Sequence, residues 1–134
     1  MKILIADDEL IMLKIIELRL KKDGHEVIVT SNGQEALEKI KQEDPDMIIA
    51  DIMMPFTSGL EIVSVVKQDK QRRNVPIIIL SSMGQENVVL EAFNLGADDY
   101  ITKPFSPNEL SMRVKRLAPR APVVKLVSIL DENT

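Results

Sequence analysis

The sequence predicts an α/β domain in which a parallel β-sheet lies between two layers of helices. Five short apolar runs alternate along the chain with longer segments whose apolar residues recur at helical spacing. Several of the short runs are apolar throughout, which is typical of strands covered on both faces. Strict alternation of strand and helix implies right-handed crossovers and therefore a parallel sheet.

The apolar runs predict five strands, over residues 2–6, 26–30, 46–51, 75–80 and 98–101. Pro76 falls at the start of the fourth run, a position where a strand tolerates proline. For five such strands we expect the flavodoxin-like order 2-1-3-4-5, which gives a three-layer (βα)5 sandwich. In that order the ligand crevice lies at the carboxyl ends of the first and third strands.

Between the strands, apolar side chains form stripes at helical spacing, and each stripe predicts a helix face that packs on the sheet. The five stripes are Leu13, Ile16 and Leu20; Ala36, Leu37 and Ile40; Ile62, Val63 and Val66; Val88, Val89, Ala92 and Phe93; and Leu110, Val114 and Leu117.

Capping residues mark the predicted helix ends. Three pairs have capping-box spacing, namely Ser31 with Gln34, Ser58 with Glu61, and Ser106 with Glu109. Pro107 then occupies the first helical position, where its missing N–H costs nothing. We expect Gly24 and Gly96 just after the first and fourth helices, where a left-handed conformation is usual.

We expect one domain over residues 1–118 and a linker or tail over 119–134. Pro119 and Pro122 cannot continue the preceding helix. The following segment, from Val123 to Leu130, is too apolar for a solvated tail. It packs on the domain, pairs with a partner or begins a second domain that is cut short.

Composition excludes several functions. The chain of 134 residues has a net charge of −4, so we do not expect this domain to bind nucleic acid. It has no cysteine, which excludes a thiolate metal site. Met1 leads directly into the first predicted strand, which leaves no room for a signal peptide. No apolar stretch approaches the ~20 residues that cross a bilayer. We therefore expect a cytoplasmic protein that contacts no membrane.

Acidic residues follow the first and third predicted strands, at the expected crevice. They are Asp7, Asp8 and Asp51. Carboxylates within ~4 Å of one another would repel by about 4 kcal/mol per pair at an effective dielectric constant of about 20. Either some protonate or a cation lies among them. Oxygen ligands alone favour a hard ion, Mg²⁺ or Mn²⁺.

A hydroxyl and an ammonium are expected at the same sheet edge, because Ser81 follows the fourth apolar run and Lys103 the fifth. Together with carboxylates and a metal they suit phosphoryl transfer, which depends on positioning and charge stabilisation. Asp51 is the candidate nucleophile, because aspartate forms acyl phosphates. Lys103 would neutralise one phosphoryl oxygen, and Ser81 would donate to another.

Four motifs at these positions resemble the response-regulator receiver domains of two-component signalling, including those of chemotaxis regulators. The motifs are residues 5–9, 51–55, 80–82 and 96–105, and the likeness runs from Met1 to about Leu117. The resemblance implies a phosphorylation-dependent signalling switch. In such a switch, Asp51 would take a phosphoryl group from the phosphohistidine of a sensor kinase or of a phosphotransfer protein.

The resemblance also implies the ligands of the metal. Asp8 and Asp51 would bind Mg²⁺ directly together with the backbone carbonyl of Met53, and Asp7 would hold the ion through water. Lys103 resembles the family's phosphoryl-pairing lysine, and its bond to Pro104 would be cis.

A switch is implied by two further positions. Ser81 stands where the family has serine or threonine, and Tyr100 where it has an aromatic switch residue. Phosphate on Asp51 would draw the Ser81 hydroxyl toward it, and Tyr100 would swing into the vacated space. This would remodel the face made by the fourth helix, fifth strand and fifth helix, where a partner, an output domain or a second copy would bind.

Met53 and Met83 lie two residues beyond Asp51 and Ser81. In receiver domains these positions flank the path of the attacking water. Two apolar side chains there would shield the acyl phosphate and slow its hydrolysis. The domain would catalyse its own phosphorylation and dephosphorylation without being a turnover enzyme. Whether it stands alone or belongs to a longer regulator stays open.

Two other functions compete with this one. An aspartyl-phosphate phosphatase of the haloacid-dehalogenase type would carry an acid two residues after its nucleophile, where this chain has Met53. A nucleotide-binding flavodoxin-like module would need a glycine-rich phosphate loop, and none follows any predicted strand.

Overall fold

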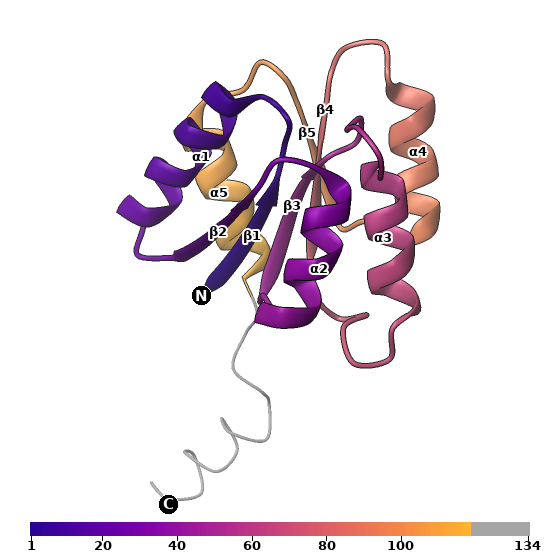
Figure 1. Ribbon diagram of the computed structural model, residues 1–134. Helices are drawn as coiled ribbons and strands as arrows, with labels where there is room; N and C mark the ends of the chain where they lie inside the picture. The colour runs from indigo at the N-terminus through magenta and orange to yellow at the C-terminus, as the bar shows by residue number, and fades with distance from the viewer. Residues whose placement is uncertain (119–134) are drawn as a thin grey trace, which may run out of the picture.

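A computed structural model describes residues 1–118, and the predicted linker or tail over 119–134 lies outside the described residues. Strands and helices alternate throughout this part of the chain (Figure 1). In chain order they are β1 (Lys2–Ala6), α1 (Leu10–Lys22), β2 (Glu26–Thr30), α2 (Gly33–Glu43), β3 (Met47–Asp51), α3 (Gly59–Gln68), β4 (Ile77–Ser81), α4 (Glu86–Leu95), β5 (Asp99–Thr102) and α5 (Pro107–Leu117).

The five strands form one parallel sheet in the order β2-β1-β3-β4-β5, which confirms the predicted flavodoxin-like topology. Ala6 of β1 lies beside Ala50 of β3, and Asp51 lies beside Leu80 of β4. This register brings the residues just after Ala6 close to the end of β3. The two predicted acidic segments therefore meet at one sheet edge.

Helices cover both faces of the sheet, with α1 and α5 on one side and α2, α3 and α4 on the other (Figure 1). Alternate residues of β1 divide between the two cores, Ile3 and Ile5 on the α1–α5 side and Leu4 and Ala6 on the opposite side. Burial on both faces explains why β1, β3 and β4 are almost continuous apolar runs. No helix within residues 1–118 is both long and apolar enough to span a bilayer.

Three strands have boundaries that differ from the prediction by one or two residues. The third begins one residue later, the fifth begins and ends one residue later, and the fourth differs most. The fourth strand begins at Ile77, because the N–H of Val75 donates to the carbonyl of Arg72 in a turn before the sheet. Pro76 therefore lies just outside the strand. Ser81 is the last residue of β4 and pairs with Thr102 of β5, whereas the prediction placed it after the strand.

One of the three predicted capping residues is wrong. Asn32 caps α2, and its side chain accepts a hydrogen bond from the N–H of Glu35 at 2.8 Å. Ser31 therefore lies one residue too early, because both residues are good caps and spacing alone does not choose between them. Ser58 and Ser106 cap α3 and α5 as predicted.

The predicted glycine positions are confirmed. Gly24 has φ = +95° and Gly96 has φ = +115°, and each follows a helix. The predicted α4 stripe is only partly correct, since Val89 and Ala92 are buried but Phe93 is 38% exposed. Phe93 lies at the margin of α4 because its ring packs edge-on against Tyr100 of β5.

The loop between β3 and α3 is tightly held by glycines at the starts of two helices. A Cβ atom on Gly33 would lie against the carbonyl oxygen and the Cβ of Thr57, far inside van der Waals contact. A Cβ on Gly59 would lie 2.5 Å from the carbonyl oxygen of Asp51. Both helices must therefore begin with glycine for the loop to fit.

The same loop contains a strained turn. Phe56 has φ = +69°, and the N–H of Thr57 donates to the carbonyl of Pro55 at 2.9 Å. A three-residue turn with positive φ at its centre is rare and strained. A bulky residue held in this region costs of order 1–3 kcal/mol. The packing around Gly33 and Gly59 must hold the turn in place.

We expect Gly33→Ala to destabilise the fold. Alanine favours a helix over glycine by up to about 1 kcal/mol, but overpacking against a fixed backbone costs about 1–3 kcal/mol. The free energy of unfolding in urea would therefore fall. Gln34→Ala, at the exposed next position of the same helix, is the matched control. Equal stability of Gly33→Ala and the wild-type protein would show that the loop is not held by this contact.

Candidate functional site

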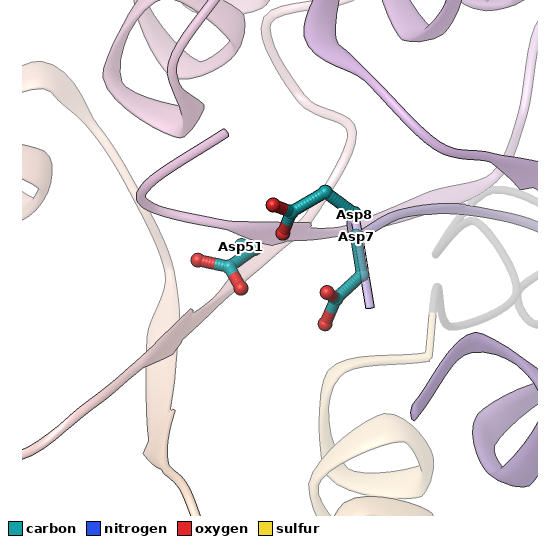
Figure 2. Close-up of side chains that lie close together, drawn as sticks. All are labelled: Asp7, Asp8 and Asp51. Carbon is teal, nitrogen blue, oxygen red and sulfur yellow. The ribbon is translucent and has the colours of Figure 1, made fainter. Parts of the chain in front are cut away.

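Three carboxylates gather at the carboxyl ends of β1 and β3, where the sequence predicted them. One carboxylate oxygen from each of Asp7, Asp8 and Asp51 lies within 4.8 Å of those of the other two. Figure 2 shows the three side chains converging from the two neighbouring strand ends. Three oxygen donors in this space, without sulfur or imidazole, fit a hard divalent cation such as Mg²⁺.

Asp7 is fully buried, and both of its oxygens accept hydrogen bonds. Oδ1 accepts from the N–H of Glu9 at 2.9 Å, and Oδ2 accepts from the ammonium of Lys103 at 2.9 Å. Burial raises the pKa of Asp7 above its ordinary value, and these hydrogen bonds offset the rise only in part. Asp8, in contrast, is exposed at the mouth of the site.

Asp51 is 8% exposed and is oriented by two donors. Its Oδ1 accepts a hydrogen bond from the N–H of Met53 at 2.9 Å, in a turn that begins at the strand end. Its Oδ2 lies 2.6 Å from the Nζ of Lys103. A carboxylate fixed in this way, close to a cation and at the edge of the site, can act as a nucleophile toward phosphorus.

Lys103 bonds to three carboxylates on two other segments of the chain. Its Nζ lies 2.9 Å from Asp7, 2.9 Å from Glu9 and 2.6 Å from Asp51. Burial alone would lower the pKa of Lys103, but the hydrogen bonds to Asp51, Asp7 and Glu9 outweigh it and raise the pKa. The side chain is therefore a fixed positive charge. The peptide bond from Lys103 to Pro104 is cis.

Ser81 is buried on the neighbouring strand end, one residue beyond the partner of Asp51. Its carbonyl accepts a hydrogen bond from the N–H of Lys103 at 2.6 Å. This contact ties the end of β4 to the segment that carries the lysine. A hydroxyl, an ammonium and a carboxylate thus lie on three adjoining segments.

Tyr100, on β5, is 42% exposed and is not part of the carboxylate cluster. It packs edge-on against Phe93, with ring centroids 5.8 Å apart. A cavity of about 330 Å³ lies between α4 and β5, and its lining includes both Ser81 and Tyr100. The predicted switch residues therefore border one space, with Tyr100 at its outer side.

Met53 and Met83 are both exposed, on the loops that follow β3 and β4. Met53 lies two residues beyond Asp51, and Met83 lies two residues beyond Ser81. Their side chains thus project from the two loops at the edge of the sheet that carries Asp51.

The sequence assigned no role to Glu9, or to the ion pairs that Asp99 makes with two arginines of α5. Glu9 bonds to Lys103, and the only sequence signal was its place directly after the acidic pair. Asp99 accepts from Arg113 at 2.8 Å and from Arg116 at 2.6 Å. Arg113 also donates to the carbonyl of Tyr100. These pairs join α5 to β5, and no local spacing in the sequence indicates them.

Comparison with known proteins agrees with this geometry. The family model described as the response regulator receiver domain matches residues 3–115. The chain belongs to the response-regulator receiver family. It is 39% identical over 122 residues to the alkaline phosphatase synthesis transcriptional regulatory protein PhoP of Bacillus subtilis, covering 91% of this chain and 50% of PhoP.

Another relative is the phosphate regulon transcriptional regulatory protein PhoB of Pseudomonas aeruginosa, 42% identical over 118 residues, which cover 88% of this chain and 52% of PhoB. The chain spans about half the length of these curated relatives. Among solved receiver structures, the chemotaxis response regulator CheY4 of Vibrio cholerae has a TM-score of 0.81 at 31% identity, covering 87% of this chain and 97% of CheY4.

A putative response regulator from Chloroflexus aurantiacus has a TM-score of 0.82 at 35% identity, and the match covers 87% of this chain and 95% of that one. Receiver domains of this family are signalling switches rather than turnover enzymes. The family therefore does not favour the phosphatase of haloacid-dehalogenase type that the sequence left as an alternative.

The raised pKa of Asp7 gives a prediction for stability without metal. A carboxyl whose pKa is raised by folding supports the fold below its ordinary pKa of 3.8, and this support is lost as pH rises through the folded value. Asp7→Asn should therefore raise the thermal midpoint in a chelator at neutral pH. The gain should disappear in acidic buffer, where the wild-type carboxyl is protonated.

Thermal unfolding of both proteins at the two pH values measures this effect, with the exposed Glu38→Gln as control. Added Mg²⁺ should then raise the midpoint of the wild-type protein more than that of Asp7→Asn, because a ligand stabilises the state it binds. A lower midpoint of Asp7→Asn in chelator at neutral pH would show that the bond to Lys103 outweighs the cost of burial.

Proposed function

We propose that this domain is a phosphorylation-dependent switch whose acceptor is Asp51. The observation that carries this proposal is the contact of 2.6 Å between Asp51 and Lys103 beside two further aspartates. The acceptor is thus next to the cation that would neutralise an incoming phosphoryl oxygen. The phosphoryl donor would be the phosphohistidine of a sensor kinase or of a phosphotransfer protein.

Asp8, Asp51 and the backbone carbonyl of Met53 would hold a divalent cation, with Asp7 contributing through water. Mg²⁺ fits this donor set, and Mn²⁺ fits it as well. When bound, the cation would neutralise negative charge on the phosphoryl oxygens. The placement of Asp7 supports an indirect role, because both of its oxygens already accept hydrogen bonds from protein groups.

In the transfer step, a carboxylate oxygen of Asp51 forms a bond to phosphorus. The bond from phosphorus to the donor imidazole nitrogen breaks, and that nitrogen keeps the electron pair. Lys103 and the hydroxyl of Ser81 would each bind one equatorial oxygen, which spreads the charge of the transition state. Hydrolysis removes the phosphoryl group, as water attacks phosphorus, the Asp51 carboxylate leaves and inorganic phosphate is released.

The output would arise from the contact between Ser81 and the phosphoryl group. Movement of the Ser81 hydroxyl toward Asp51 would enlarge the cavity that it shares with Tyr100, and the half-exposed ring would move inward. The face made by α4, β5 and α5 would change shape as a result. An output domain, a downstream protein or a second copy of the chain would bind one of its two forms.

The lengths and names of the relatives support an output region joined to the receiver, because PhoP and PhoB are transcriptional regulators about twice as long as this chain. On this proposal residues 1–118 form the receiver and 119–134 begin the connection to that region. The receiver itself would not bind nucleic acid, and the protein would act in the cytoplasm.

Replacing the acceptor should abolish phosphorylation without unfolding the domain. We expect Asp51→Asn to take up no phosphoryl group from acetyl phosphate or from a kinase, because an amide does not form an acyl phosphate. Intact mass would measure uptake, and circular dichroism would check the fold. Wild-type label should be removed by hydroxylamine, which cleaves acyl phosphates. Labelling that persists in Asp51→Asn would assign the acceptor to another residue.

The two exposed methionines should lengthen the lifetime of the phosphorylated form. Replacing both, as Met53→Ser with Met83→Ser, should speed loss of phosphate several-fold, because smaller polar side chains admit water to phosphorus. The decay of prephosphorylated protein after removal of donor measures this rate. Met112→Ser, at an exposed methionine of α5, is the control. Equal decay of the double variant and the wild-type protein would contradict the shielding role.

A further inference from the structure

Phe56 combines an uncommon backbone conformation with an exposed aromatic side chain. Its backbone has φ = +69° in a strained three-residue turn, a conformation that favours glycine or asparagine over a bulky side chain. Its ring is 85% exposed, so burial in this domain does not explain why the residue is aromatic. Local rules are most often broken at functional sites, and the outlier itself is the reason to look for a function.

The turn fixes the backbone from which the Phe56 side chain projects. Pro55 limits the backbone before the turn, and Thr57 after it is packed against Gly33 at the start of α2. The turn is therefore built into the frame of the domain and does not adjust freely. An aromatic side chain with only two χ angles on a constrained backbone loses little conformational entropy on binding, which suits it to anchor a partner.

The position of Phe56 on the loop after Asp51 indicates that the partner is the protein that brings the phosphoryl group. The residue lies on the loop that follows the acceptor strand, and Met53 of the same loop is also exposed. Met83, after β4, and Leu10, at the start of α1, add exposed apolar side chains to the same sheet edge. Any protein that brings a phosphoryl group to Asp51 must contact this edge.

The negative charge of this edge further limits which partner surface would fit it. Beside the apolar side chains the edge exposes the carboxylates of Asp8 and Glu9. A complementary partner would present apolar residues around its phosphorylated group, with basic residues at the rim. The cavity between α4 and β5 has Met83 in its lining but not Phe56, Met53 or Leu10, so Phe56 itself lies outside the cavity assigned to output.

We propose that Phe56 is an anchor for the protein that donates the phosphoryl group, a phosphohistidine protein with an apolar surface and a basic rim. This inference rests on the proposed function and adds a residue that selects the donor. Phe56 does not touch the reacting atoms. It acts by binding, so a donor without a protein surface does not need it.

The test compares a protein donor with a small one. The full chain is phosphorylated by phosphoramidate, and separately by an autophosphorylated sensor histidine kinase chosen from a panel as the fastest toward the wild-type chain. The variants are Phe56→Gly, which relieves the strained backbone, and Phe56→Tyr, which keeps the aromatic ring. Val65→Ala, at an exposed apolar position on α3, is the control.

We expect Phe56→Gly to lower kcat/KM with the kinase by about tenfold or more through a higher KM, as for loss of an interface hot spot. Phosphoramidate labelling should stay unchanged, and Phe56→Tyr should keep most of the kinase rate. The thermal midpoint of Phe56→Gly should equal or exceed that of the wild-type chain, because glycine fits the turn.

Three results would overturn the inference. Kinase transfer to Phe56→Gly at the wild-type rate would show that the ring is not an anchor. A parallel fall with phosphoramidate would assign the effect to the shape of the acceptor loop. A change of oligomeric state alone would assign the ring to a second copy of the chain. Failure of the wild-type chain to accept phosphate from either donor would instead overturn the proposed function.

Discussion

The candidate site depends on the ion pairs that the ammonium of Lys103 makes with three carboxylates. This ammonium joins carboxylates that follow β1 and end β3 to the segment after β5, with contacts of 2.6–2.9 Å to Asp7, Glu9 and Asp51. At an effective dielectric constant of about 20, two carboxylates 4 Å apart repel by about 4 kcal/mol, and one cation among them offsets much of this repulsion. A single lysine cannot neutralise the cluster, which leaves it suited to a divalent cation. Because the carboxylates outnumber the lysine, binding of a cation or of a phosphoryl group would change the balance of charge in the site.

Hydrogen bonds to backbone carbonyls connect Lys103 to Ser81, and Tyr100 to α5. The N–H of Lys103 donates to the carbonyl of Ser81, so the lysine and the hydroxyl residue are parts of one hydrogen-bonded unit. Tyr100 lies three residues before Lys103, and its carbonyl accepts a hydrogen bond from Arg113 of α5. Asp99 holds Arg113 and Arg116 in turn. A shift of Lys103 or Ser81 would therefore move β5, and the hydrogen bonds and ion pairs described above would pass that movement to α5. This supports a two-state face at α4, β5 and α5.

Most of the fold was predictable because strands buried on both faces leave continuous apolar runs in the sequence. The interiors of β1, β3 and β4 and the order of all five strands followed from this signal and from the rules of parallel sheets. Errors arose where a local choice depends on tertiary contacts. Asn32 rather than Ser31 caps α2, and a turn closed by Val75 delays β4 to Ile77. Phe93 has helical spacing, yet its ring packs on Tyr100 at the surface, because the neighbouring strand offers an aromatic partner there.

The site could be predicted because its residues follow strand ends, and those strand ends could be predicted. Asp7, Asp8 and Asp51 converge as predicted because a parallel sheet places alternate chain segments at one edge. What the sequence did not reveal is how backbone conformation restricts the surroundings of these residues. Nothing in the letters around Phe56 indicates a positive φ, since the turn arises from the close approach of Thr57 to Gly33 in a different helix. An exposed aromatic in such a turn stabilises neither the core nor the backbone. Its presence on the loop after Asp51, the proposed acceptor, is therefore better explained by recognition of another molecule than by folding of this one.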